Sequence, residues 1–284
     1  CGNSTDGSSS SIFQVNFLSA IRVIITKGIK VKKLVLESLI TIAATSNVFA
    51  ECTYNFDATE TQISQIDSSL TGFPIKNNQK VGFNIVSNDG LKIYGAYSSA
   101  YAANRISGVN NGDITAQSSG IFAYEYKLKV PTNLFSGQEA VLFFPLAMSG
   151  TLNNSQTEVL AVGYTNNVPS NPDKNELILS IDSTATNLRL PVVTTPSGYQ
   201  TLGIYINRDT NQVGLIHNGV NKGYIGPISS NFNKLAFWNY AGQNAIPVNS
   251  TNLGKEISFE LITDHTKLQN TYPTGAKDIC GNVI

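Results

Sequence analysis

The chain has 284 residues, with 19 Lys+Arg, 19 Asp+Glu and a formal net charge of zero at pH 7. Charged residues make up only 13% of it, which excludes the basic surface that a nucleic-acid-binding protein presents. The section from residue 51 onward carries a slight acidic excess and is long enough for one large β domain with its own core.

Residues 31–50 have the pattern of a bacterial secretory signal peptide. Two lysines precede an apolar stretch over 34–44, and the segment ends in Val-Phe-Ala, which supplies the small residues of a cleavage site. Cleavage between Ala50 and Glu51 would begin the mature chain one residue before a cysteine. The segment therefore predicts an exported protein that resides in the periplasm, at the outer surface or outside the cell.

Residues 1–30 precede this signal and leave three interpretations open. They form a non-native upstream extension or disordered tail, or Cys1 is the lipid-modified first residue of a lipoprotein, or residues 12–44 form a membrane anchor. A basic cluster interrupts that last stretch, and neither apolar half reaches the roughly 20 residues that a bilayer span requires. We therefore expect no membrane span in the mature chain.

Two cysteines remain after the cleavage site, one near each end of the mature chain. In an oxidising compartment Cys52 and Cys280 should form a disulfide bond. Their Cα atoms must then lie within about 7 Å of each other, so the two ends of the domain should be neighbours. A reactive or metal-bound thiol pair is the alternative, although no histidine lies near either cysteine in the sequence.

The chain after residue 66 shows alternation of period two and no helical periodicity, which predicts an antiparallel sandwich or barrel. In 124–130, apolar residues alternate with Glu125, Lys127 and Lys129. Long loops are expected over 98–119 and 165–175, and a turn at 88–90. We expect strands over 81–85, 91–94, 124–130, 141–146, 159–164, 176–181, 202–207, 212–217, 222–225, 234–240 and 256–262.

Residues 199–226 hold the most specific pattern in the sequence. Two alternating strands flank a turn over 208–211, and Asn218-Gly219 supplies a two-residue hairpin turn that needs positive φ. This order resembles the central strands of laminin-G and concanavalin A-like jelly rolls, and 253–261 resembles their closing strand. The resemblance implies an all-β, antiparallel β-sandwich, with 51–284 as a single domain.

The export signal, the Cys-Thr-Tyr-Asn-Phe-Asp start and the Asp-Ile-Cys-Gly end also resemble a family of exported bacterial proteins known as a domain of unknown function. That resemblance implies secretion and implies no activity. A fold of this kind hosts many functions, so the function must be argued from a site.

Known catalytic patterns are missing from the sequence. Glycoside hydrolases of the concanavalin A-like fold commonly carry alternating acids on one strand, and no such triplet occurs here. Glu256 and Glu260 share a strand parity but are four residues apart, which favours a solvated face. His217 and His265 have no metal-like spacing, and His217 is expected to be a hydrogen-bonded structural imidazole.

Asn207, Asp209 and Asn211 alternate like the start of a calcium-binding loop. The glycine and the bidentate acid of an EF-hand loop are absent at the later positions, so turn chemistry is the simpler explanation. We therefore expect no cofactor, with calcium at these three residues as the weaker alternative.

One aromatic stretch could bind a ligand. Trp238, Asn239, Tyr240 and Gln243 lie on and after a predicted strand, and they combine rings for the apolar faces of a sugar with amides for its hydroxyls. On that strand Trp238 and Tyr240 should face opposite to Asn239. The competing interpretation is that both aromatic rings belong to the core.

The function expected from the sequence is that of an exported, non-catalytic β-sandwich that binds a glycan or another cell-surface molecule. A structural or adhesin-like envelope protein with a protein partner is a second reading. A divergent polysaccharide hydrolase is a third, and it would need distant carboxylates brought together, such as Asp182 with Glu158 or Glu176.

Overall fold

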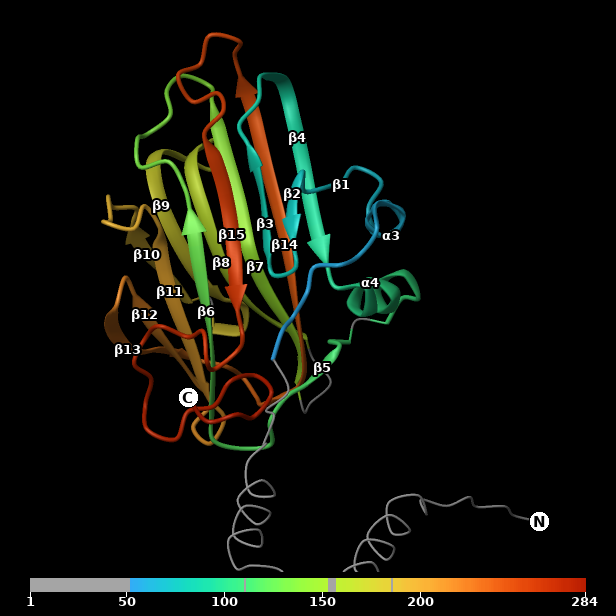
Figure 1. Cartoon of the computed structure of the whole chain (residues 1–284), viewed down its shortest axis with the longest axis vertical. Coiled ribbons are helices and arrows are strands. Elements are labelled where there is room, and N and C mark those ends of the chain that lie inside the picture. Colours follow the sequence, from blue (N-terminus) through green and yellow to red (C-terminus); the bar gives the residue numbers. More distant parts are fainter. Residues whose placement is uncertain (1–51, 110, 153–156, 185) are drawn as a thin grey trace, which may run out of the picture. The chain divides into compact units, whose positions relative to one another are not determined.

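The computed structural model describes residues 52–284 apart from 110, 153–156 and 185. The predicted extension, the signal peptide and the Ala50–Glu51 cleavage site lie outside the described residues. The described part is a sandwich of two β-sheets packed face to face (Figure 1). Neighbouring strands are antiparallel, except where the two-residue strand β1 runs parallel to β4.

The first sheet has the strand order β1-β4-β14-β7-β8-β9-β10, and β5 pairs with β14 beside this path. Its strands are β1 (Thr71–Gly72), β4 (Asn88–Tyr97), β5 (Ile114–Thr115), β7 (Ala140–Leu152), β8 (Thr157–Val168), β9 (Asn171–Ile181), β10 (Thr186–Pro191) and β14 (Phe232–Ile246).

The second sheet has the order β13-β12-β11-β6-β15-β3-β2. Its strands are β2 (Ile75–Asn77), β3 (Lys80–Asn84), β6 (Ile121–Lys129), β11 (Gln200–Asn207), β12 (Gln212–His217), β13 (Val220–Pro227) and β15 (Glu256–Ile262). The predicted closing strand is β15, which lies between β6 and the early strand β3.

Alternation along the strands fills the space between the sheets. In β6 the inward residues are aromatic or aliphatic and belong to the main core cluster, whereas the outward residues include Glu125, Lys127 and Lys129. Tyr124 and Tyr126 meet Phe237 of β14 and Phe259 of β15 in tilted or edge-on contacts. Such ring pairs add specific geometry to the burial of large apolar areas, and the Tyr124–Phe237 pair joins the two sheets.

Two short helices cover part of the outer face of the first sheet. Helix α3 (Glu60–Ile66) begins with a capping box between Thr59 and Gln62, and α4 (Ser99–Ile106) begins at the N-cap Ser98. Together with residues of β4 and β14 they form a second apolar cluster, beside those strands in Figure 1. A single 3-10 turn, η1 (Asp182–Thr184), follows β9.

The predicted all-β sandwich is confirmed, and the expected strands occur with shifted ends. Asn218 (φ 49°) and Gly219 (φ 79°) form the predicted positive-φ turn between β12 and β13. The prediction that no helix follows residue 66 was wrong, because α4 occupies part of the 98–119 stretch that was expected to be a loop.

Two further loop predictions were also wrong. Residues 88–90 are the start of β4 rather than a turn, since the chain crosses from β3 to the other sheet over 85–87. The stretch 165–175 is the end of a close hairpin between β8 and β9. Asn167 (φ 52°) and Asp173 (φ 58°) hold positive φ there, a conformation that Asn and Asp tolerate.

The disulfide joins the two ends of the sandwich. Cys52 and Cys280 are bonded, with their Cα atoms 5.9 Å apart across 228 residues. The Thr263 hydroxyl donates to the Cys52 carbonyl (2.6 Å), which holds the segment at Cys52 beside the end of β15. The predicted proximity of the ends is thus present in the structure.

Candidate functional site

The outer face of the second sheet is covered over one half and open over the other. The C-terminal segment 263–284 covers the first half, where Tyr272 packs against Ala123, Tyr205 and Ile216. The buried carboxylate of Glu125 holds this segment, because its Oε1 accepts hydrogen bonds from the backbone N–H groups of residues 269 and 270 (2.8 and 2.6 Å) and from the Tyr272 hydroxyl (3.1 Å).

The open half carries one row of polar side chains that runs across the strands. Strand register pairs Thr201 with Lys127, Lys127 with Glu260, Glu260 with Lys80, and Lys80 with Asn77. Residues paired directly across a sheet point to the same side. We call these residues, together with Asn218, the cross-strand row: Asn218, Thr201, Lys127, Glu260, Lys80 and Asn77.

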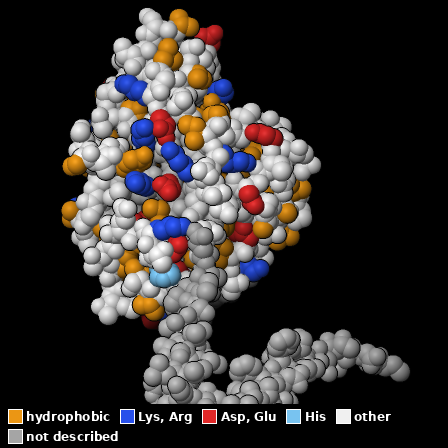
Figure 2. Space-filling model, viewed as in Figure 1, with side chains coloured by type: hydrophobic (Ala, Val, Ile, Leu, Met, Phe, Trp, Pro, Cys, Tyr) orange, Lys and Arg blue, Asp and Glu red, His pale blue; other side chains and the backbone are white. Residues whose placement is uncertain are grey.

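Asn218 extends the row beyond β11. Its side-chain Oδ1 accepts a hydrogen bond from the Thr201 backbone N–H (2.8 Å), and its own N–H donates to the Thr201 carbonyl (2.8 Å). Five strand-to-strand steps of about 4.8 Å make the row about 24 Å long. Figure 2 shows charged side chains gathered in the middle of this face, over β6, β15 and β3.

Two hollows occupy the ends of the row. The larger one measures about 600 Å³, and its lining includes Lys127, Glu260, Lys80 and Asn77 of the row. Amides and hydroxyls surround these charges, contributed by the N-terminal segment, the β2–β3 turn and the C-terminal segment: Thr53, Asn55, Asn78, Gln79 and Gln269. The smaller hollow, of about 280 Å³, is lined by Thr195, Pro196, Ser197, Tyr199, Thr201 and Asn218.

Tyr199 lies between the two hollows. It lines the smaller one, and its ring centroid lies 4.6 Å from the Lys127 ammonium, a cation–π distance. Tyr199 is half-buried and immediately precedes β11, so the sheet holds its backbone in place. The cross-strand row and the adjacent Tyr199 therefore bring cationic groups, amides and one aromatic ring together on this face.

Glu256 organises the lysines beside the row. Its carboxylate oxygens pair with the Lys80 and Lys129 ammonium groups at 2.9 and 2.8 Å. The hydrogen bond from Lys129 is the main reason that the pKa of Glu256 falls from its ordinary 4.5 to about 2. The expected solvated face of Glu256 and Glu260 is present, but the two acids differ, because Glu260 is exposed and has no ion-pair partner among the described residues.

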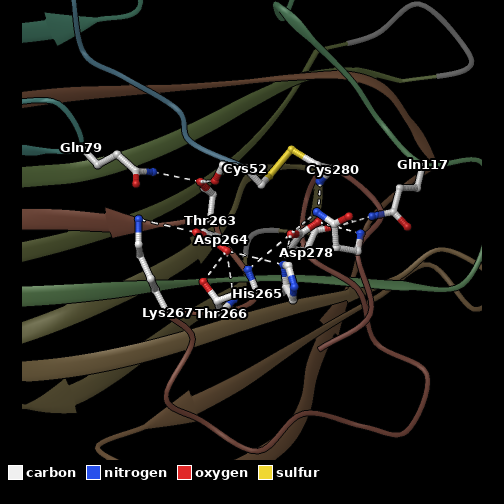
Figure 3. Close-up of a disulfide and its surroundings, with 11 residues drawn as sticks. Cys52, Gln79, Gln117, Thr263, Asp264, His265, Thr266, Lys267, Asp278 and Cys280 are labelled. Carbon is white, nitrogen blue, oxygen red and sulfur yellow. Dashed lines mark hydrogen bonds and ion pairs between the residues drawn. A yellow bond between two sulfur atoms is a disulfide. The ribbon is translucent and has the colours of Figure 1, made fainter. Parts of the chain in front are cut away.

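A polar network beside the disulfide supports one wall of the larger hollow (Figure 3). Asp278 is fully buried and accepts hydrogen bonds from the backbone N–H and Nδ1 of His265, from the Cys280 N–H and from the N–H and side-chain amide of Asn282. Gln79 donates to the Thr263 hydroxyl (2.9 Å), which links this network to the wall.

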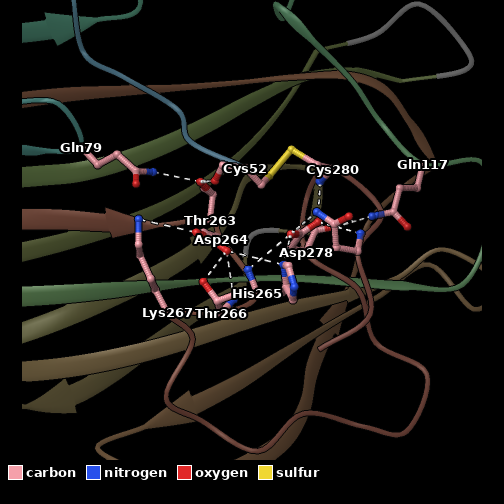
Figure 4. A network of polar contacts seen from close by, with 11 residues as sticks. Cys52, Gln79, Gln117, Thr263, Asp264, His265, Thr266, Lys267, Asp278 and Cys280 are labelled. Atoms are coloured by element: carbon pink, nitrogen blue, oxygen red, sulfur yellow. Dashed lines mark hydrogen bonds and ion pairs between the residues drawn. A yellow bond between two sulfur atoms is a disulfide. The ribbon is translucent and has the colours of Figure 1, made fainter. Parts of the chain in front are cut away.

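The same network contains three groups of the kind that bind metals. One ligand atom each of Asp264, His265 and Asp278 lies within 4.8 Å of the others (Figure 4). Protein donors already occupy these carboxylates: Asp278 as above, and Asp264 through the N–H and hydroxyl of Thr266 (both 2.9 Å). The arrangement is that of a structural clamp at the chain's end.

The structure separates the four ligand-binding candidates read from the sequence. Trp238 and Tyr240 lie half-buried on the outer face of the first sheet, where Trp238 stacks with Tyr97 (centroids 6.5 Å apart) beneath the helices. Asn239 and Gln243 are fully buried and have the parity of the inner face. The two aromatic residues are therefore together, and the two amides lie on the other side of the sheet.

The calcium candidates form a turn between β11 and β12. The Asn207 Oδ1 accepts the N–H groups of Asp209 and Thr210 (3.0 and 3.2 Å), and the Asp209 Oδ1 accepts the Gly120 N–H (3.1 Å). Asn211 adopts φ 54° at the end of the turn. These side-chain oxygens serve the backbone of the turn as hydrogen-bond acceptors.

The carboxylates named for a divergent hydrolase differ in burial and in partners, although the β8–β9 register brings Glu158 and Asp182 to neighbouring strand ends. Glu158 is buried, whereas Asp182 is exposed at the end of β9. Glu176 lies six residues before Asp182, about 20 Å along an extended strand, and pairs with Arg189. His217 is buried and hydrogen-bonded to the Asn218 side chain (3.1 Å), and burial lowers its pKa.

Sequence reasoning did not find the cross-strand row. The alternation around Lys127 and the shared parity of Glu256 and Glu260 did indicate outward-facing residues. The row joins strands that are up to 183 residues apart in sequence, Asn77 on β2 and Glu260 on β15. Register between such strands depends on the assembled sheet, so alternation alone could not align them.

Comparison with solved structures gives distant likenesses. A Trypanosoma rangeli sialidase matches with a TM-score of 0.32 and 11% identity, covering 66% of this chain and 26% of the sialidase, so the chain spans about a quarter of that enzyme. Alginate lyase A1-II′, a member of polysaccharide lyase family 7, matches with a TM-score of 0.33 and 12% identity, covering 64% and 75% of the two chains. LamAcat from Zobellia galactanivorans matches with a TM-score of 0.30 and 13% identity, covering 51% and 63%.

Among the described residues, no helix combines the length and the apolar character needed to cross a membrane. The search of curated proteins found no match. A family model does match residues 31–282, which include the predicted signal segment and nearly the whole sandwich. The chain belongs to the family described as Domain of unknown function (DUF4882).

Proposed function

We propose that this chain is an exported, non-catalytic β-sandwich that binds a glycan along the cross-strand row. The observation that carries the proposal is the row itself: six polar residues in one line across the open half of a sheet, with a hollow at each end. A linear glycan fits such a site because polar side chains on successive strands can bind its hydroxyl groups.

Tyr199 supports this reading at the centre of the row. A sugar ring has an apolar face of C–H groups, which packs on an aromatic ring, and Tyr199 supplies one between the hollows. Ligand sites combine a concave surface with a few convergent polar groups, and the larger hollow has both. Export is supported by the predicted signal at 31–50 and by the disulfide, a bond typical of oxidising compartments.

The non-catalytic part of the proposal rests on the carboxylates of this face. Glu256 and Glu260 are about 13 Å apart along β15, beyond the separations that retaining and inverting glycosidases use. Glu125 is a diagonal neighbour of Glu260, but the backbone at 269–270 and the Tyr272 hydroxyl occupy one of its oxygens. We expect a bound glycan to be released intact.

A thermal-shift screen tests this function. The purified protein, with its disulfide intact, is heated with a panel of bacterial and host glycans, with and without calcium. A ligand at about 100 times its dissociation constant adds about 2.7 kcal/mol of stability, which raises the melting temperature visibly. A selective shift without release of reducing ends is the expected result.

Two outcomes would contradict the proposal. Release of new reducing ends that is lost in Glu260→Gln would make the protein a hydrolase. No shift with any glycan from a folded sample would favour the envelope-protein reading, and pull-down from envelope extracts would then follow.

A further inference from the structure

We propose that the glycan held by the cross-strand row is acidic, bearing carboxylate or sulfate groups along its length. Lys127 is the residue that binds these anionic groups and selects for them. This inference rests on the proposed function and specifies its ligand class. It follows from how positive charge is distributed and paired on this face.

Positive charge is concentrated at the larger hollow. Its lining contains Lys80, Lys127 and Lys267 but a single acidic residue, Glu260. The chain as a whole has equal numbers of basic and acidic residues. A hollow with a surplus of one sign in a neutral protein raises the local concentration of ligands of the other sign.

The three lysines differ in their partners. Lys80 pairs with Glu256 (2.9 Å), and the Lys267 ammonium lies 3.5 Å from an Asp264 oxygen. Lys127 has no carboxylate within ion-pair distance among the described residues, and its contact is the Tyr199 ring. An ammonium oriented by a ring and lacking a counter-ion remains able to bind an anionic ligand group.

Position makes Lys127 the central charge of the site. It lies on β6, the middle strand of the second sheet, and it lines the larger hollow beside the ring that lines the smaller one. A sugar packed on Tyr199 therefore brings its charged substituent next to the Lys127 ammonium. Amides around the hollow remain available for hydroxyl groups, which distinguishes this surface from a simple polyanion site.

Substitution of Glu260 should change the affinity for an acidic glycan in the opposite direction to substitution of Lys127. The register pairs the exposed Glu260 with both Lys127 and Lys80. Its negative charge therefore repels an anionic ligand bound in the larger hollow. Removing the charge of Glu260 should strengthen the binding of an acidic glycan, whereas removing the charge of Lys127 should weaken that binding. A neutral glycan should respond little to either change.

The experiment is titration calorimetry of the intact protein with four probes: oligogalacturonate, its methyl ester, a sulfated galactan oligomer and polyglutamate as a polyanion without sugar. The ester keeps the sugar backbone and removes the charge, so acid and ester form a matched pair. We expect the protein to bind a charged probe at least about tenfold more tightly than the ester, with the difference shrinking at high salt. The carboxylate and sulfate probes separate the two sources of charge.

Variants assign the preference to Lys127. Lys127→Met should lower the affinity for the charged probe about ten- to a hundredfold. Lys127→Arg should retain most of this affinity, and Glu260→Gln should increase it. Lys92→Met is the matched control, because Lys92 also lies over a tyrosine ring (5.6 Å from that of Tyr94) but on the first sheet. Melting curves verify that each variant is folded.

The outcomes separate this inference from the proposed function. Equal binding of acid and ester would overturn the acidic class and leave glycan binding intact. Binding of polyglutamate as tightly as the sugar would also overturn it, since a polyanion site would not need a glycan. Failure to bind any of the probes or any glycan of the thermal-shift panel would overturn the proposed function itself.

Discussion

Glu256 is the residue on the open face whose ionisation the fold controls most strongly. Lys80 and Lys129 approach it from the two neighbouring strands, and its side chain is half-buried between them. Because its pKa is about 2 in the folded protein and near 4.5 otherwise, the ionised form stabilises the fold. This contribution is fully present above about pH 4.5 and is lost as the pH falls toward 2.

Glu256→Gln should therefore be less stable than the wild type near neutral pH, and the difference should shrink as the pH falls from about 4.5 to about 2. Urea unfolding at a series of pH values measures it. Glu260→Gln is the control on the same strand and face: it removes an exposed carboxylate without an ion-pair partner among the described residues, so its stability near neutral pH should stay close to that of the wild type. A deficit of Glu256→Gln that stays constant down to about pH 2 would mean that the ion pairs do not lower this pKa.

Among elements, the pairing of β11 with β12 determines how the C-terminal segment lies on the second sheet. Tyr205 stands opposite Gly214, and its ring fills the space above that glycine. A Cβ at position 214 would lie 2.0 Å from the ring. The ring also meets Tyr272 edge-on (centroids 6.3 Å apart), so it connects the sheet to the segment that covers it.

Gly214→Ala should lower the free energy of unfolding by about 1–3 kcal/mol, because Tyr205 must move and lose its contact with Tyr272. Chemical denaturation gives the value. Gly90→Ala is the control, since a Cβ there meets nothing within 4 Å and its φ is not positive, so its stability should stay near that of the wild type. Equal effects of the two substitutions would show that Tyr205 accommodates the methyl group freely.

Strands could be predicted from the sequence where one of their faces is buried in the core. The segments around Tyr124, Leu202 and Phe259 alternate cleanly because one side packs in the core, so their strands and faces could be read from the sequence. The strands at 159–164 and 176–181 were predicted, but the end of their hairpin was expected to be a loop because its residues are mostly polar. Helix α4 was missed because eight residues are too few for a clear helical period, although Ser98 gave a capping signal.

The candidate site was less predictable than the fold. Composition and the aromatic Trp238 directed attention to the first sheet, whereas the row lies on the second. Lys127 and Glu260 could each be assigned to an outer face, but their pairing requires a register between strands that are 133 residues apart. Only the assembled sheet supplies that register.

At the scale of the whole molecule, the disulfide joins the first and last segments of the sandwich. It closes a loop of 228 residues, so it restricts the unfolded chain strongly. Replacing both Cys52 and Cys280 by Ser should cost about 2–5 kcal/mol. Urea unfolding of the double variant beside the reduced wild type measures the loss, and both should shift alike. An unchanged midpoint in both samples would mean that the core alone holds the ends in place.

The central claim is that the ligand lies on the cross-strand row of the second sheet. The most direct test is the affinity of Tyr199→Ala for the best glycan of the screen, measured by calorimetry beside Tyr240→Ala on the first sheet. We predict a loss of about 1–3 kcal/mol for Tyr199→Ala, by analogy with removal of an aromatic ring that stacks on a nucleic-acid base, and unchanged affinity for Tyr240→Ala. Loss of binding in Tyr240→Ala with full binding in Tyr199→Ala would contradict the claim and place the site on the first sheet.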